Sequence, residues 1–392
     1  MPCQRAAVAD DGRSTCEPPV TLRLLFTYAG GEGHLQPLLP LACAAAAAGH
    51  DVAVSGAAVL APVVRAAGLR HLPSGPDVAP KRVPLRAADM ERERRVLHDS
   101  FAGAGARERV RDLVAICGSR RPDVIVRDET DFGAAVVAEL VNVRPASVVV
   151  LAAGSFSTPE LVAEPLNRLR AEHGLAPDPD MEMLTRGLVL SPFPPSFRDP
   201  ADPLPAGART FRMSDTAPAV GGAGSLVYVT LGTIFNTESG DVFKRALDGV
   251  SRLPLDVVAT VGRTMDPAEL GPQRGNVRVE RYVPQAELLP HCAAVVSHAG
   301  SGSVLGALEH GVPLVCVPIG ADQPLNAARC TALGVGLALD AIAFTPDDAR
   351  RAVSEVVGGA RYREAAARLR AEIAAQPPAR ELVALLERLA PG

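Results

Sequence analysis

Residues 281–326, which read RYVPQAELLPHCAAVVSHAGSGSVLGALEHGVPLVCVPIGADQPLN, contain the pattern that decides the fold of this chain. An apolar run at 293–296 stops at Ser297-His298, continues through the small residues 300–303 and leads into a helical pattern. This order predicts a strand, a tight turn and a helix. The first N–H groups of such a helix have no intrahelical partner, and its dipole is positive at that end. We therefore expect the turn to hold a diphosphate, with residues 318–326 closing the same site.

The residues after 225 repeat this alternation of strand and helix. Short apolar runs separated by helical patterns lie at residues 226–231, 257–261, 277–280, 293–297 and 313–317. Parallel strands have this pattern because helices cover both faces of their sheet. The second half is therefore predicted to be a doubly wound parallel sheet. Residues 361–389 are helical in pattern apart from Pro377-Pro378, and we expect this terminal segment to brace two domains against each other.

The first half has the same alternation. Predicted strands lie at residues 22–27, 51–55, 124–126 and 146–151, and predicted helices at 108–116 and 132–140. Residues 78–99 are rich in arginine and poorly periodic. We predict a mobile loop over a site there, and a solvated helical face is the alternative.

Proline and glycine accumulate between residues 191 and 224, which indicates a linker. A chain of 392 residues is long enough for two domains. We predict an α/β protein of two Rossmann-like, doubly wound domains that face a cleft, where ligands of parallel sheets bind. The expected divisions are a loose tail at 1–20, a domain for a partner substrate at 21–205, a linker at 206–224, a nucleotide domain at 225–372 and a C-terminal helix at 373–392.

Composition excludes several classes of protein. The net charge of −4 argues against a nucleic-acid footprint and against a charged membrane-binding surface. Seven cysteines without a C-x-x-C pair indicate a reduced, cytoplasmic setting with neither disulfides nor a zinc site. Residues 1–20 contain no apolar core of a signal peptide, and the longest apolar run, at 38–48, is too short to span a bilayer. The sequence leaves open whether the chain forms a homodimer.

A histidine follows the first predicted strand. The preceding Gly31-x-Gly33 invites a dinucleotide interpretation, but position 36 is Gln where a third glycine should stand. The second strand also ends without the acid that would hold a ribose, so we expect neither NAD nor FAD, and no other cofactor. His34 lies at the mouth of the expected cleft, and we predict a functional role for it. A capping or packing role is the alternative.

An imidazole can take a proton from an alcohol at neutral pH when its other nitrogen is oriented by a partner. Three acids follow the predicted strand at 124–126, namely Asp128, Glu129 and Asp131. Carboxyl ends of parallel strands meet at one edge of the sheet, so these acids should face the same cleft as His34. We predict Asp128 as the orienting acid because it lies closest to the strand end. The alternative is that the trio caps the next helix.

Asp178-Pro179-Asp180 has the spacing of a metal–diphosphate site, but it lies in a proline-rich loop, so we interpret it as a turn. No other cluster of carboxylates or histidines has metal-ligand spacing, and we expect no metal. A bound diphosphate would then be stabilised by the helix dipole, backbone N–H groups and His298.

At this point the residues resemble a known family. The sequence is similar to glycosyltransferase family 1, in its bacterial natural-product branch. The motifs that carry the resemblance are residues 281–285, His298-Ala299-Gly300-Ser301-Gly302-Ser303, Gly311-Val312-Pro313, Asp322-Gln323-Pro324-x-Asn326-Ala327, Gly33-His34-x-x-Pro37, Leu231-Gly232-Thr233 and the proline-rich stretch at 191–197. Nearly the whole chain after residue 20 is covered.

The resemblance implies a GT-B fold and inverting sugar transfer. It implies that Tyr282 stacks on the nucleotide base and that Val283 meets the base edge through its backbone. The residues expected to hold the diphosphate are His298, Gly300, Ser301, Gly302 and Ser303, with Thr233 near the phosphate or sugar. Asp322 and Gln323 would bind sugar hydroxyls. His34 would be the base, oriented by Asp128.

One departure from the family pattern concerns the nucleotide. Plant relatives that use UDP-sugars place a Glu eight residues after the motif His, where it accepts hydrogen bonds from both ribose hydroxyls. Here that position is Gly306. Losing a charged hydrogen-bond partner should cost a ribose donor about 1.5–3 kcal/mol and a deoxyribose donor less. The resemblance and this glycine together predict a dTDP-activated, deoxygenated sugar.

The acceptor is expected in the first half. Small and apolar residues at 152–156, which include Ser155 and Phe156, should line a hydrophobic pocket with Phe101 and the loop at 78–99. That lining suits a polyketide or aromatic aglycone better than a polysaccharide. The alternatives are a catalytically silent partner protein of GT-B shape, C-glycosylation of an aromatic acceptor by the same base, and epimerisation of a nucleotide sugar.

Overall fold

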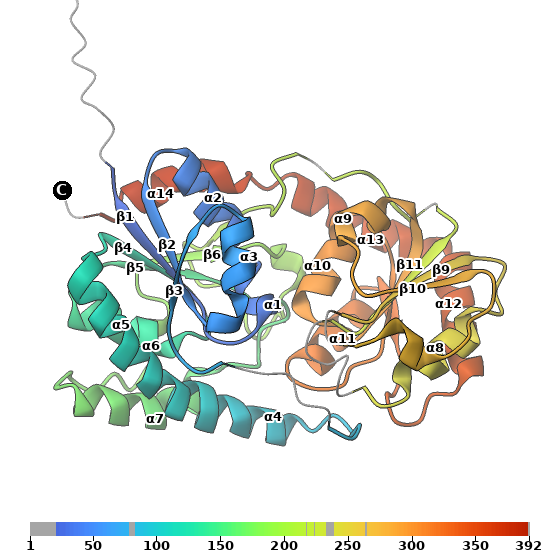
Figure 1. Ribbon diagram of the computed structural model, residues 1–392, viewed down its shortest axis with the longest axis horizontal. Coiled ribbons are helices and arrows are strands. Elements are labelled where there is room, and N and C mark those ends of the chain that lie inside the picture. Colours follow the sequence, from blue (N-terminus) through green and yellow to red (C-terminus); the bar gives the residue numbers. More distant parts are fainter. Residues whose placement is uncertain are drawn as a thin grey trace, which may run out of the picture.

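The computed structural model describes residues 21–77, 83–216, 218–222, 224–232, 239–262 and 265–390. They form two α/β halves that lie side by side (Figure 1). The expected tail at residues 1–20 lies outside the described residues.

The first half is built on a parallel seven-stranded sheet with the order β3-β2-β1-β4-β5-β6-β7. Its strands are β1 (Arg23–Thr27), β2 (Asp51–Gly56), β3 (Arg70–Pro73), β4 (Val124–Asp128), β5 (Pro145–Val148), β6 (Leu188–Ser191) and β7 (Arg209–Thr210). Alternate residues of β1 enter different cores, since Leu24 and Phe26 pack on one face and Leu25 on the other. This is the period of two that a strand covered on both faces requires.

Helices cover both faces of the first sheet. The helices are α1 (Glu32–Leu35), α2 (Leu39–Ala47), α3 (Ala61–Ala66), α4 (Met90–Val96), α5 (Ala106–Arg120), α6 (Phe132–Leu140) and α7 (Pro159–Glu172). Buried side chains of α2 and α3 pack with Leu24 and Phe26, whereas those of α5, α6 and α7 pack with Leu25 (Figure 1).

The second half is built on a parallel six-stranded sheet with the order β10-β9-β8-β11-β12-β13. Its strands are β8 (Leu226–Thr230), β9 (Asp256–Thr260), β10 (Val277–Glu280), β11 (Cys292–Ser297), β12 (Leu314–Cys316) and β13 (Gly336–Ala338). Its helices are α8 (Val242–Val250), α9 (Gln285–Leu288), α10 (Ser301–Glu309), α11 (Gln323–Ala332), α12 (Pro346–Gly358) and α13 (Ala360–Ala374). Helices α8 and α12 bury one face of this sheet, and α10, α11 and α13 bury the other. The predicted pair of doubly wound sheets is confirmed.

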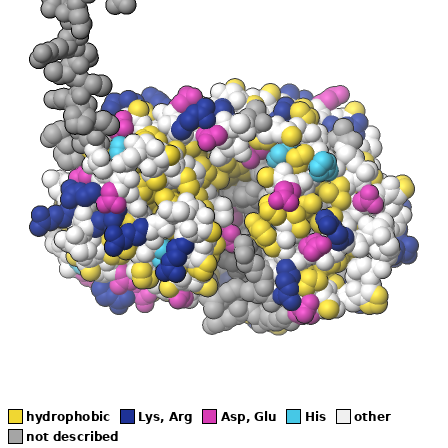
Figure 2. All heavy atoms as spheres, turned by 45° about the horizontal axis from the view of Figure 1, so that its top comes forward, with side chains coloured by type: hydrophobic (Ala, Val, Ile, Leu, Met, Phe, Trp, Pro, Cys, Tyr) yellow, Lys and Arg dark blue, Asp and Glu magenta, His cyan; other side chains and the backbone are white. Residues whose placement is uncertain are grey.

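The C-terminal segment contacts both halves. Helix α13 packs against α10 in the second half. After Pro377-Pro378 the chain forms a short turn of helix and α14 (Val383–Glu387), whose buried side chains join the core around α2 in the first half (Figure 1). Between the two halves the surface is hollowed, and hydrophobic side chains line both sides of the hollow (Figure 2).

The structure differs from the sequence prediction at two places. Residues 90–99, predicted as part of a loop, are helical, because Asp89 caps α4 by accepting hydrogen bonds from Glu91 and Arg92 N–H. The helix continues as a π-helical segment, η2 (Leu97–Gly105), which buries Leu97 and Ala102 in the first core. Strand β7, which falls in the predicted linker, pairs with β6 and completes the first sheet. The part of the predicted loop at 78–82 lies outside the described residues.

No helix among the described residues is both long enough and apolar enough to cross a membrane.

Candidate active site

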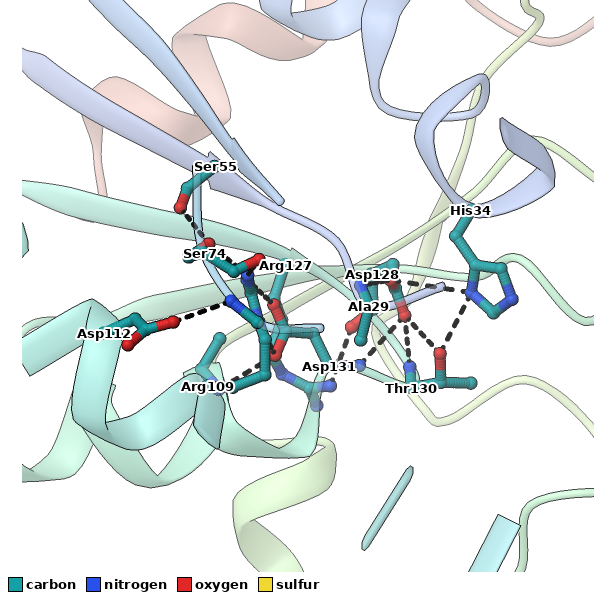
Figure 3. Close-up of polar contacts among 12 residues, drawn as sticks. Ala29, His34, Ser55, Ser74, Arg109, Asp112, Arg127, Asp128, Thr130 and Asp131 are labelled. Atoms are coloured by element: carbon teal, nitrogen blue, oxygen red, sulfur yellow. Dashed lines mark hydrogen bonds and ion pairs between the residues drawn. The ribbon is translucent and has the colours of Figure 1, made fainter. Parts of the chain in front are cut away.

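His34 and Asp128 meet at one edge of the first sheet. Strands β1 and β4 are neighbours in parallel register, with Thr27 opposite Arg127, so the chain beyond β1 and the end of β4 leave the sheet together. The His34 ring lies against the backbone of Gly30, where a Cβ atom would come within 2.8 Å of the ring. Gly30 also has a φ of 122°, which favours glycine. The Nδ1 atom of His34 is 3.6 Å from Oδ2 of Asp128 (Figure 3).

The Thr130 hydroxyl lies between these two groups. Its Oγ1 is 3.0 Å from His34 Nδ1 and donates to Asp128 Oδ1 at 2.7 Å (Figure 3). Thr130 was not predicted from the sequence, although it stands among the three acids expected to orient His34. Phe101, which was predicted to contact the acceptor, stacks on the His34 ring, with 5.9 Å between the ring centroids and 26° between the planes. The imidazole is therefore held at its Nδ1 atom and over one face.

Asp128, which ends β4, and the two acids that follow it have separate partners. Asp131 forms a buried ion pair with Arg109 and caps α6 by accepting a hydrogen bond from Ala134 N–H at 3.2 Å. Glu129 Oε1 accepts hydrogen bonds from the N–H groups of Val150 and Leu151 at 2.7 and 2.6 Å. Of the three, the structure places Asp128 beside His34, and the alternative role of helix cap belongs to Asp131.

The carboxylate of Asp128 is fully buried and accepts hydrogen bonds at both oxygens. Oδ2 accepts from Ala29 N–H at 2.7 Å, and Oδ1 accepts from the N–H groups of Thr130 and Asp131 at 2.5 and 2.9 Å. Burial raises the pKa of Asp128, but its interaction with His34 and these hydrogen bonds outweigh burial and lower the pKa below its ordinary value. Asp128 therefore stays ionised at neutral pH.

The pKa of His34 is shifted in the opposite direction to that of Asp128. Burial lowers the pKa of His34, but contact with the Asp128 carboxylate and the charges of Asp322 and Glu129 outweigh burial and raise the pKa. A raised pKa makes the neutral ring a stronger proton acceptor. Because Asp322 belongs to the second half, its effect on His34 shows that the two halves face each other across this site.

The turn between β11 and α10 has the predicted strand–turn–helix form. The His298 ring packs against the backbones of Gly232 and Gly300, where a Cβ atom would lie 2.7 and 2.4 Å from its Nε2. Ala299, between His298 and Gly300, has a φ of 64°, in the left-handed region. Burial lowers the pKa of His298 to about 4, so the ring is neutral at pH 7. A neutral His298 can offer a hydrogen bond to a phosphate, while α10 supplies the positive dipole end.

Several residues predicted to bind the donor also join the two halves. Ser301 Oγ donates to Asp322 Oδ2 at 2.7 Å and accepts from Ala152 N–H at 2.8 Å. Asn326 accepts from Ala153 N–H at 3.0 Å and donates to Ala299 O and Asp322 Oδ2. Ala152 and Ala153 follow β5 of the first half. The sequence did not indicate that Ser301 and Asn326 connect the halves.

The other predicted donor residues differ in burial and in their contacts. Gly302 is exposed and Ser303 half-buried in the first turn of α10. Gln323 is buried, and its amide oxygen accepts from Ile319 and Gly320 N–H, so this oxygen shapes the turn before α11. Tyr282 is 52 % exposed, and with Val283 it borders a groove beside β9 and β10. Thr233 lies outside the described residues.

The predicted acceptor residues have different surroundings. Ser155 N–H and Oγ donate to Asp202 and Asp199 at 2.6 and 3.0 Å, so its polar groups bind the loop after β6. Phe156 is only 6 % exposed and packs in the core of the first half. Phe101 stacks on His34, a predicted catalytic residue. Asp178, interpreted as a turn residue, accepts from Glu182 and Met183 N–H, as a turn requires.

Known proteins resemble this chain over almost its whole length. The family model "Erythromycin biosynthesis protein CIII-like, C-terminal domain" matches residues 244–389. The 4'-demethylrebeccamycin synthase of Lentzea aerocolonigenes is 30% identical over 428 residues, which cover 94% of this chain and 99% of that protein. The 3-alpha-mycarosylerythronolide B desosaminyl transferase of Saccharopolyspora erythraea is 28% identical, with 95% of this chain and 99% of that protein covered.

Solved structures agree with this result. The glycosyltransferase SnogD from Streptomyces nogalater is 28% identical with a TM-score of 0.76, covering 95% of this chain and 100% of that one. The glycosyltransferase VinC, solved in complex with DTDP, is 26% identical with a TM-score of 0.73, covering 94% and 99%. The chain therefore belongs to glycosyltransferase family 1, in its bacterial natural-product branch, and has the GT-B fold.

Proposed function

We propose that the protein transfers a deoxygenated sugar from a dTDP-activated donor to a hydroxyl of a hydrophobic natural-product aglycone, with inversion at the anomeric carbon. The observation that carries the proposal is the contact of His34 with Thr130 and Asp128 at the edge of the first sheet, opposite Asp322 of the second. This contact supports a role for His34 as a proton acceptor opposite residues proposed to hold a sugar nucleotide.

The proposed reaction is a single displacement. His34 removes the acceptor hydroxyl proton while that oxygen attacks the anomeric carbon, and the bond from this carbon to the diphosphate oxygen breaks. The new bond is the glycosidic bond, and dTDP leaves with the electron pair. Charge that develops on the diphosphate is stabilised by the N-terminus of α10 and by His298. The products are the glycoside, dTDP and a protonated His34.

Gly306 supports the choice of nucleotide. A Cβ atom at this position would lie 2.9 Å from Gln285 Oε1 and 3.3 Å from Leu289 Cδ1, so the Gln285 amide occupies the space beside it. The VinC structure was solved with DTDP, which agrees with a deoxyribose nucleotide in a related protein.

We expect a matched dTDP-sugar to have a kcat/KM about 10- to 150-fold above that of the corresponding UDP-sugar, since a lost charged hydrogen bond is worth about 1.5–3 kcal/mol. The measurement is kcat/KM with both donors and one acceptor. Gly306→Glu should bring the kcat/KM values of the two donors closer together if the new side chain displaces the flexible end of Gln285. Gly306→Gln is the uncharged control. Equal binding and turnover of the two donors would refute the dTDP preference.

The pH dependence of kcat/KM follows from the pKa of His34. Neutral His34 is the active base, and its pKa is raised above 6.5, so kcat/KM should increase with pH through a value above 6.5. Asp128→Asn removes the largest of the interactions that raise this pKa, whereas burial, which lowers it, remains, so the acid limb should move to lower pH. Asp123→Asn, at the opposite end of β4, is the control and should leave the limb in place. An acid limb that stays where it is in Asp128→Asn contradicts this account.

The transferase itself is tested by release of dTDP with and without an acceptor, using a panel of hydrophobic aglycones. Release that depends on the acceptor, together with a glycoside detected by mass spectrometry, is expected. Nucleotide binding without release under any condition would instead indicate a silent partner protein. The anomeric configuration of the product, read by NMR, tests inversion.

A further inference from the structure

The Thr130 hydroxyl lies between His34 and Asp128, which are not directly hydrogen-bonded. The shortest distance from His34 Nδ1 to an oxygen of Asp128 is 3.6 Å, which is too long for a hydrogen bond. Thr130 Oγ1 is 3.0 Å from the same nitrogen and 2.7 Å from Asp128 Oδ1. We propose that Thr130 is a positioning residue whose hydroxyl relays between Asp128 and His34 and fixes the tautomer that leaves Nε2 as the base. The inference rests on the proposed function, in which His34 is that base.

The assignment of protons follows from the chemistry of the three groups. An ionised carboxylate only accepts hydrogen bonds, so the single hydroxyl proton of Thr130 goes to Asp128. The hydroxyl then presents a lone pair to His34, and Nδ1 must carry a proton to use it. In a neutral imidazole the other nitrogen, Nε2, is then the acceptor. The Thr130 hydroxyl therefore selects one of the two neutral forms of His34.

The rest of the site holds the Asp128 carboxylate 3.6 Å from His34 Nδ1. Its Oδ1 already accepts the N–H groups of Thr130 and Asp131, and its Oδ2 accepts that of Ala29. These bonds fix the carboxylate in the turn after β4. The His34 ring is likewise confined by the backbone of Gly30 and by the stacked Phe101. The Thr130 hydroxyl spans the gap, at 3.0 Å from His34 Nδ1 and 2.7 Å from Asp128 Oδ1.

A purely structural role for Thr130 must be separated from this relay. Thr130 is 1 % exposed, and a buried hydroxyl needs a partner, which Asp128 supplies whether or not His34 is used. Thr130→Val keeps the shape of the side chain and removes the hydroxyl, whereas Thr130→Ser keeps the hydroxyl. Thr130→Ala removes the hydroxyl without adding a methyl group and serves if the valine variant does not fold.

The experiment reads the His34 tautomer by nitrogen-15 NMR of the full chain labelled at histidine, at a pH above the His34 pKa. The His34 signals are assigned by their loss in His34→Gln. In the wild type and in Thr130→Ser, Nδ1 should be protonated and Nε2 unprotonated. In Thr130→Val or Thr130→Ala, a fraction with protonated Nε2 should appear, and kcat should fall roughly tenfold or more with donor KM little changed.

The result that overturns the proposal is a Thr130→Val or Thr130→Ala protein that keeps the wild-type tautomer and a kcat within about twofold of wild type, since Asp128 would then orient His34 without help. A tautomer that changes while kcat does not would uphold the relay and refute His34 as the base. The tautomer readout therefore separates failure of this inference from failure of the proposed function.

Discussion

Replacing His34 by Ala is expected to lower kcat by roughly 10²–10⁴, the contribution of a positioned general base, while the affinity for dTDP changes little. The two effects separate because His34 belongs to the first half, whereas the residues proposed to hold the nucleotide and diphosphate belong to the second. Steady-state kinetics give kcat, and calorimetric titration of dTDP gives the affinity.

The matched control is His173→Ala. His173 is an exposed residue at the end of α7 in the same half, and its removal should leave both kcat and dTDP affinity unchanged. If His34→Ala instead abolishes dTDP binding while residual turnover stays high, His34 has a structural role and the proposed mechanism is wrong. This comparison needs no knowledge of the natural acceptor, provided that one aglycone supports measurable turnover.

The parts of the site that could be predicted from sequence depend on strand ends. His34 and Asp128 follow β1 and β4, and parallel strands present their carboxyl ends at one edge, so their proximity follows from topology alone. The α6 helix was predicted at its observed bounds because its residues are apolar and followed a clear strand. The positions of His34 and Asp128 at strand ends were therefore enough to predict that the two residues lie close together.

Other features depend on contacts that no sequence pattern specifies. Thr130 owes its place to the tight turn that wraps the Asp128 carboxylate, and a threonine between two acids has no distinctive signature. The helix α4 is polar and poorly periodic, because its stability comes from the Asp89 cap and from the η2 segment that anchors its end in the core. Local propensity does not report such tertiary support.

Ser301 shows a further limit of the sequence. Its place at the start of α10 predicted a role in holding the donor, whereas in the structure its hydroxyl accepts a hydrogen bond from Ala152 of the other half. A hydroxyl both donates and accepts, and only the assembled structure shows which partners it uses. The contact also connects the proposed donor site with the loop after β5, so a ligand that repositions Ser301 would act on both halves.

The buried ion pair between Arg109 and Asp131 predicts the largest effect on stability. The two side chains are 3 % and 0 % exposed, and Arg109 also donates to the backbone oxygen of Ser74 (Figure 3). Arg109→Met would leave the Asp131 carboxylate buried without its cation. Removing one partner of a buried pair typically costs about 3–5 kcal/mol, so we expect a loss of this size in the free energy of unfolding by urea.

Arg107→Met is a control from the same helix. Arg107 pairs with Glu172 at the surface, where the side chains are 49% and 41% exposed, and exposed pairs contribute at most about 1 kcal/mol. In Arg109→Met combined with Asp131→Asn, neither charge of this pair stays buried without its partner, so the double variant should lose less than the sum of the single losses. Because Asp131 and Asp128 share the turn after β4, the predicted order of stabilities also tests whether that turn depends on the α5 helix behind it. Equal stabilities for Arg109→Met and Arg107→Met would show that the buried pair does not hold this turn in place.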